Sequence, residues 1–173
     1  MLAVALVVAL GVALGLAGLR LAQLRSVPMA VSRAVPAQGS GSSVVELSAD
    51  TWAYSSAQAV QDLFQRYFDA INTKNYDAWE TTVVPALVAQ QPEASWHQAY
   101  GSTVDGTIRI SRIDERSPGR LVALVSFIST QRADSATDDL KAGRICWREA
   151  FALTGEPPVI DVVRNRSVLR GSC

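Results

Sequence analysis

Two cysteines, Cys146 and Cys173, are the residues of this 173-residue chain whose chemistry is most sharply defined. A structural zinc site takes four cysteine or histidine ligands, so two thiols with no histidine near them argue against a metal site. One interpretation is a disulfide that ties the C-terminus to the segment around Cys146, stabilises the fold by roughly 3 to 4 kcal/mol, and requires an oxidising compartment. The alternative is two unrelated thiols.

The other reactive side chains form no recognised catalytic motif. His97 is the only histidine, with Trp96 before it and Tyr100 shortly after it. The sequence contains no phosphate-binding glycine loop, no Ser-His-Asp signature and no cluster of metal ligands. We therefore expect no cofactor, no metal and no enzymatic activity.

The overall charge argues against one large class of partner. Lys and Arg number 16, Asp and Glu also number 16, and the formal net charge is zero. Binding to nucleic acid requires a clustered cationic excess, so we expect no nucleic-acid partner. Only Lys74 and Lys141 are lysines. The preference for Arg, Ala and Val is typical of a GC-rich genome.

The elements that must position these residues begin with an apolar segment. Residues 1–19 carry no charged side chain, and Arg20 is the first charged residue. A helix of about eighteen residues spans about 27 Å, close to the roughly 30 Å hydrocarbon core of a bilayer. We expect an uncleaved transmembrane anchor over residues 1–25, because a signal peptide has a basic start and a shorter apolar stretch. A cleaved signal peptide is the alternative.

One face of this anchor carries small residues. Gly11, Gly15 and Gly18 lie at i, i+4 and i+7, and the first two form a GxxxG pattern. This face permits close packing against another membrane helix, which predicts a membrane protein complex as the partner. The alternative is incidental glycine in a helix that contacts only lipid.

Two features of the sequence predict opposite orientations for the anchor. Arg20, Arg25 and Arg33 follow the apolar segment, and the positive-inside rule would place the C-terminal domain in the cytoplasm. The two cysteines favour an oxidising compartment instead. We expect an extracytoplasmic C-terminal domain.

A linker and one domain follow the anchor. Residues 26–50 are rich in Pro, Gly and Ser and lack a sustained hydrophobic period, which predicts a flexible linker. The domain covers residues 51–173. Its first helix is expected to start with a capping box of Ser55 and Gln58. The helix carries an apolar stripe at helical spacing, made of Val60, Leu63, Phe64, Tyr67, Phe68 and Ile71.

Shorter helices and then strands complete the domain. One helix is expected between Asn75 and Pro85 and another over residues 93–100. Strands are expected over residues 107–113, 120–130, 144–154 and 159–163. The second strand is apolar at odd and even positions, which predicts a central strand covered on both faces. Helices followed by consecutive strands predict an α+β fold, with the helices on one face of a curved antiparallel sheet.

Residues 60–79, VQDLFQRYFDAINTKNYDAW, resemble the opening of nuclear-transport-factor-2-like domains. In that family a long helix ends in an Ala-x-Asn turn, and an aromatic residue begins the next helix. The segments CWREAFAL and VIDVV are similar to the last two strands of the family. The resemblance covers about residues 55–163 and implies a cone-like domain. A single N-terminal span before this fold is also the layout of type IV secretion inner-membrane scaffolds and of actinobacterial mammalian-cell-entry-associated membrane proteins.

The resemblance implies two alternative functions. The first is a non-enzymatic, membrane-anchored assembly or accessory subunit of a cell-envelope complex for transport or secretion. The second is a pocket in the cone that binds a small ligand or catalyses an isomerase- or dehydratase-type reaction. Enzymatic members of the family place an Asp, His or Tyr in this pocket for proton transfer. The corresponding candidates here are His97, Asp105 and Tyr67, with Asp69 as a further polar residue.

Three arginines near the C-terminus share one strand parity. Arg164, Arg166 and Arg170 could contact anionic lipid headgroups or an acidic partner. The alternative is a solvated strand edge, where the charges protect against aggregation.

Overall fold

The computed structural model describes residues 35–135, 142–162 and 168–173. The chain divides into two compact units, Met1–Val35 and Pro36–Cys173. The elements described below belong to the second unit, which contains an α+β fold.

The expected membrane anchor over residues 1–25, with Gly11, Gly15 and Gly18, lies outside the described residues. Within the described ranges, no helix has the length and apolar character needed to cross a membrane.

After the two-residue strand β1, the helices of the second unit precede its long strands, as the sequence predicts. They are the 3-10 helix η1 (Ala49–Ala53), α2 (Ala57–Thr73), α3 (Tyr76–Glu80), α4 (Pro85–Gln90) and α5 (Glu93–Tyr100), with the short 3-10 helix η2 (Ala133–Ser135) further along the chain. The stripe predicted on α2 is buried, and Val60, Leu63 and Phe64 have no exposed surface. Helix α4 was not expected. Pro85 begins it, because the fixed φ of proline suits the first turn of a helix.

The ends of α2 are set by local backbone chemistry. The N-cap is Ser56, without a side-chain hydrogen bond, so the predicted Ser55–Gln58 capping box is wrong. Gln58 instead donates to Asp62, one turn further on, at 2.8 Å. At the other end, Lys74 has a φ of 60° and forms a left-handed C-cap. Asn75 then caps α3 by accepting a hydrogen bond from the backbone amide of Ala78.

The strands form one mixed sheet. They are β1 (Glu46–Leu47), β2 (Val104–Ser117), β3 (Arg120–Thr130), β4 (Arg144–Thr154), β5 (Val159–Ile160) and β6 (Val168–Ser172). The order is β1-β2-β3-β4-β5, and β6 also pairs with β4. The sheet is not purely antiparallel as expected, because β1 runs parallel to β2. The other described pairs are antiparallel.

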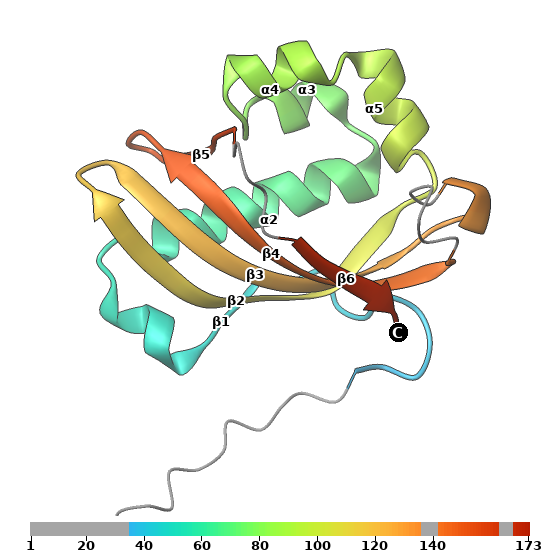
Figure 1. The fold of residues 1–173 in the computed structure, drawn as a ribbon, viewed down its shortest axis with the longest axis horizontal. Coiled ribbons are helices and arrows are strands. Elements are labelled where there is room, and N and C mark those ends of the chain that lie inside the picture. Colours follow the sequence, from blue (N-terminus) through green and yellow to red (C-terminus); the bar gives the residue numbers. More distant parts are fainter. Residues whose placement is uncertain (1–34, 136–141, 163–167) are drawn as a thin grey trace, which may run out of the picture. The chain divides into compact units, whose positions relative to one another are not determined.

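The core lies between α2 and the sheet. In Figure 1, α2 runs along the sheet, and α3, α4 and α5 are grouped together. Ala123 and Val125 of the central strand β3 are buried in this core. Leu124 points to the other face and is 40% exposed, so the expectation that both faces of this strand are covered is wrong there. The helices cover one face of the sheet, which leaves the opposite face partly open.

The second half of the expected linker belongs to the domain. Val45 is 1% exposed. Its amide donates to the Gln65 side chain at 2.9 Å, and its carbonyl accepts from the Gln61 side chain at 2.7 Å. The adjoining β1 pairs with β2. A segment this short carries no hydrophobic period, so only its contacts with α2 and β2 distinguish it from a linker.

Candidate functional site

A cavity of about 330 Å³ opens between the inner face of the sheet and helices α2 and α5. Aromatic rings make up much of its wall: Tyr67, Phe68, Tyr100, Phe127, Trp147 and Phe151. Polar side chains on the wall include Asp105 and Ser129. A second space of about 150 Å³ adjoins it and shares Tyr67, Tyr100, Glu149 and Phe151.

Asp105 is the most unusual group in this cavity. Its side chain is 3% exposed, and the Ser129 hydroxyl donates a hydrogen bond to its Oδ1 atom. Burial raises the pKa of Asp105 to about 6, while the Ser129 hydrogen bond and the positive charge of Lys74 act in the opposite direction. A carboxyl group with this pKa changes its charge just below neutral pH, as a proton donor or acceptor does.

A β-bulge in β2 turns Asp105 toward the cavity. Ile108 of β2 faces the core, and regular alternation would place Asp105, three residues earlier, on the opposite face. The register with β3 shifts between Gly106 and Arg109, where β2 contains one extra residue. A bulge re-aims the side chains beside it. Asp105 therefore lies on the inner face, where it pairs with Ser129.

The end of α2 supports the same strand. Lys74 Nζ donates to the backbone carbonyls of Ile71 and Thr103. Partial burial lowers the pKa of Lys74, and the charge of Asp105 raises it. The C-cap of α2 thus brings a cation close to the Asp105 carboxyl, and burial still dominates the pKa of that carboxyl.

The structure separates the residues that the sequence proposed for a pocket. Asp105 and Tyr67 both line the cavity. The side chain of His97 is 43% exposed and lies 3.6 Å from Glu93, and its ring packs against Trp96. Asp69 is exposed and accepts a hydrogen bond from Gln65. The histidine is outside the cavity because α5 turns it away from the core.

Sequence reasoning missed several residues of the cavity. Ser129, Trp147 and Glu149 line it from β3 and β4. Glu149 is only 5% exposed. Their signal was available in the strand alternation, because Trp147 and Glu149 share the parity of the buried Phe151.

The C-terminal strand β6 forms one side of the cavity. Val168 and Arg170 line the wall, and the guanidinium of Arg170 lies 5.7 Å from the centre of the Trp147 ring. Arg164 and Arg166, which we grouped with Arg170, lie outside the described residues.

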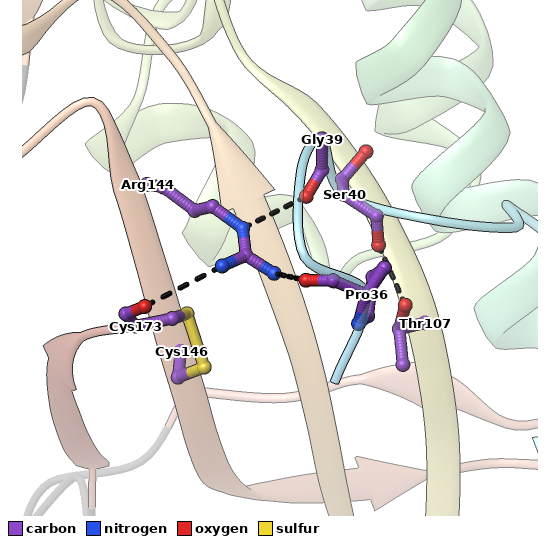
Figure 2. The surroundings of a disulfide bond; sticks show 7 residues. All are labelled: Pro36, Gly39, Ser40, Thr107, Arg144, Cys146 and Cys173. Atoms are coloured by element: carbon purple, nitrogen blue, oxygen red, sulfur yellow. Dashed lines mark hydrogen bonds between the residues drawn. A yellow bond between two sulfur atoms is a disulfide. The ribbon is translucent and has the colours of Figure 1, made fainter. Parts of the chain in front are cut away.

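A disulfide joins Cys146 of β4 to Cys173 directly after β6, with the Cα atoms 5.4 Å apart (Figure 2). Cys146 pairs with Gly171 in the sheet, so the second cysteine lies beside this pair. Continuing the hairpin register of the predicted strands 144–154 and 159–163 along the chain would instead place residues near position 167 opposite Cys146. The difference arises because β6 follows a connection that the strand pattern does not reveal.

Comparisons of the chain with protein-family models, with curated proteins and with solved structures gave no significant match. Across the described ranges, no group of three or more His, Cys, Asp or Glu side chains is arranged to hold a metal ion. The chemistry on the cavity wall is that of its aromatic rings, its hydroxyl groups, the carboxyl groups of Asp105 and Glu149, and the Arg170 guanidinium.

Proposed function

We propose that this domain binds a small, largely apolar molecule that carries one hydrogen-bonding group. The observation that carries the proposal is the Asp105 carboxyl, 3% exposed, on the wall of an aromatic cavity of about 330 Å³. Cavities of this size with mostly apolar walls and a few polar groups are typical ligand sites. The rings hold the apolar body, and Asp105 meets the polar group.

The energetics of Asp105 support a role beyond stability. A buried carboxylate with a raised pKa destabilises the folded protein at neutral pH. Groups that cost stability and lie in a cavity are concentrated at functional sites. The structural alternative is that Asp105 only supports the pairing of β2 with β3 through Ser129. Because that role needs an acceptor and no charge, an amide would serve it equally well.

The proposal also concerns the family and the cellular location of the domain. We propose that it belongs to the nuclear-transport-factor-2-like group, supported by helices α2 to α5 preceding the long strands β2 to β4 and by the cavity between α2 and the sheet. We also propose a membrane-anchored domain outside the cytoplasm, supported by the apolar N-terminal sequence and by the Cys146–Cys173 disulfide. The assembly role stays a prediction. The cavity makes ligand binding the better supported function.

Two simple aromatic compounds test the proposal. Purified full-length protein is titrated with p-cresol and with toluene, which differ by one hydroxyl group. Binding is followed through the NMR signals of the Trp147 indole and the Asp105 amide. We expect both compounds to shift the Trp147 signal, and p-cresol to bind about tenfold more tightly, since a hydrogen bond to a charged group contributes roughly 1.5–3 kcal/mol.

Two variants locate the interaction. Asp105→Asn should remove most of the preference for p-cresol, because the neutral amide is a weaker acceptor than the carboxylate. His97→Ala should leave both affinities unchanged, because this side chain lies outside the cavity. Failure of both compounds to shift Trp147 in the wild-type protein would refute the proposed function.

A further inference from the structure

Residue Thr107 has a backbone conformation that needs external support. It lies within the bulge of β2, two residues after Asp105. Its φ of 51° is in the left-handed region, which β-branched residues rarely adopt. Such a conformation persists only where surrounding contacts hold it.

Two hydrogen bonds from Thr107 to the segment before β1 provide this support. Its Oγ1 atom donates to the carbonyl of Ser40 at 2.6 Å (Figure 2), and its backbone amide donates to the carbonyl of Ser42 at 2.7 Å. Both acceptors are main-chain atoms. The support therefore depends on the path of this segment and not on its side chains.

Two glycines fix that path. A Cβ atom on Gly106 would lie 2.6 Å from the Gly41 carbonyl oxygen and 2.7 Å from that of Ser40. A Cβ atom on Gly41, whose φ is 86°, would overlap Oγ1 of Thr107. The two backbones are packed against each other with no room for a side chain between them.

Arg144 of β4 holds the beginning of the same segment. Its guanidinium donates to the carbonyls of Gly39, at 2.8 Å, and Pro36, and a third bond reaches the carbonyl of Cys173 at 3.4 Å (Figure 2). The disulfide fixes Cys173 to the same strand, next to Arg144. The segment is thus fastened both to the bulge of β2 and to β4.

We propose that residues 36–42 are a positioning segment, which holds the Thr107 bulge and thereby turns the Asp105 carboxyl into the cavity. The inference rests on the proposed function, in which that carboxyl meets the ligand. Thr107 and Gly41 act through Asp105 and touch no ligand. When the segment releases Thr107, β2 regains regular alternation, and Asp105 turns toward the open face of the sheet and toward water.

The decisive readout is the titration of Asp105 in ligand-free protein. Its carboxyl carbon is followed by NMR against pH in the full chain in detergent. The titratable or charged groups around the cavity are left unchanged: Lys74, Tyr67, Tyr100, Glu149 and Arg170. Thr107→Val removes the hydroxyl and keeps the shape, whereas Thr107→Ser keeps the hydroxyl. We expect the Ser variant to titrate near 6, as in the wild type. In the Val variant the pKa should fall toward the ordinary value of 3.8.

A second pair of variants separates positioning from general loss of stability. Gly41 and Gly119 both have positive φ, and a Cβ atom on Gly119 would meet nothing. Gly41→Ala and Gly119→Ala should therefore both lower the melting temperature, because of the shared strain. Only Gly41→Ala should lower the pKa of Asp105. It should also weaken p-cresol binding about tenfold, to the level of toluene, since the hydrogen bond to the carboxylate is lost.

The outcomes distinguish this inference from the proposed function. An Asp105 pKa that stays near 6 in both Thr107→Val and Gly41→Ala overturns the positioning role, whatever the ligand results. If Gly41→Ala does not fold, the Thr107 pair decides alone. If the Asp105 pKa falls in Thr107→Val and Gly41→Ala but neither p-cresol nor toluene binds the wild-type protein, the positioning role is supported and ligand binding is refuted.

Discussion

The side chain of Asn72 makes two hydrogen bonds to the backbone of Asp105. Its Nδ2 atom donates to the Asp105 carbonyl at 3.0 Å, and the Asp105 amide donates to its Oδ1 atom at 2.7 Å. Asn72 lies in the last turn of α2, so this pair ties the end of the helix to β2 where the carboxyl enters the cavity. Asp105 is therefore held from the helix side by Asn72 and from the other side by the Thr107 bulge.

Asn72→Ala should lower both stability and ligand binding. The variant leaves the amide and carbonyl of Asp105 without their partners, which costs roughly 1–3 kcal/mol. Thermal denaturation should show a melting temperature lower by several degrees. Asn75→Ala is the control: it removes a helix cap, which costs a comparable roughly 1 kcal/mol, and it should leave p-cresol affinity unchanged. Equal p-cresol affinity in the two variants would contradict the role of Asn72.

The raised pKa of Asp105 predicts how stability depends on pH. The pKa is about 6 in the folded protein and 3.8 as the ordinary value. Below 3.8 the group is protonated in both states, and above 6 it is ionised in both, so its destabilising effect develops between these values and is complete above 6. At pH 8, Asp105→Asn should therefore raise the free energy of unfolding by up to about 3 kcal/mol, and with it the melting temperature. At pH 3.5 the substitution should have little effect on either. Denaturation at the two pH values checks this, and an equal effect at both would contradict the assigned pKa.

The elements of this fold were more predictable than its cavity. The stripe on α2 and the strand 120–130 follow from local periodicity, which the sequence displays directly. The strands β1 and β6 were missed because they are short and are stabilised by partners far away in the chain. Their existence depends on contacts with β2 and β4 that no local pattern records.

The placement of Asp105 illustrates the same limit at a single residue. Alternation from Ile108 would put Asp105 on the outer face of the sheet, and only the extra residue in the bulge reverses this. A glycine next to a threonine is a weak signal for a bulge. His97, by contrast, was suggested by its residue type alone, and the helix carries it away from the cavity. Residue type identifies chemistry, but the register of a strand decides which chemistry reaches a site.

Removing the disulfide should destabilise the domain. Cys146 and Cys173 are separated by 27 residues, and a bridge across such a loop contributes roughly 3 to 4 kcal/mol by restricting the unfolded chain. Cys146→Ser should lower the melting temperature by several degrees. Wild-type protein treated with reductant is the control and should match the variant. Two free thiols, found by non-reducing mass spectrometry of protein from its native compartment, would contradict the bridge.

Reporter fusions after Cys173 test the proposed location. A reporter that is active only outside the cytoplasm should be active at this position, because the disulfide requires an oxidising compartment. A reporter that functions only in the cytoplasm should be silent. The opposite result would agree with Arg20, Arg25 and Arg33 under the positive-inside rule, and it would overturn the extracytoplasmic location.

Two N-terminal deletions that differ by seven residues should have different effects on the pKa of Asp105. Deleting residues 1–35 removes one compact unit and leaves Pro36–Cys173 complete. This fragment should fold, keep the Asp105 pKa near 6 and bind p-cresol with wild-type affinity. Deleting residues 1–42 removes only seven more residues, but it takes away both carbonyl acceptors of Thr107 and the partners of Arg144 at Pro36 and Gly39.

The longer deletion should therefore release the bulge. It leaves Val45 and its hydrogen bonds to α2 in place, so the fragment should remain folded, with a melting temperature lower by several degrees. Its Asp105 pKa should fall toward 3.8, and its p-cresol affinity should drop about tenfold, because the carboxyl turns toward water and loses its contact with the ligand. Circular dichroism establishes folding, and the NMR titration measures the pKa. If the two fragments titrate alike, residues 36–42 only cover the sheet, and Asp105 is positioned by Asn72 and Ser129 alone.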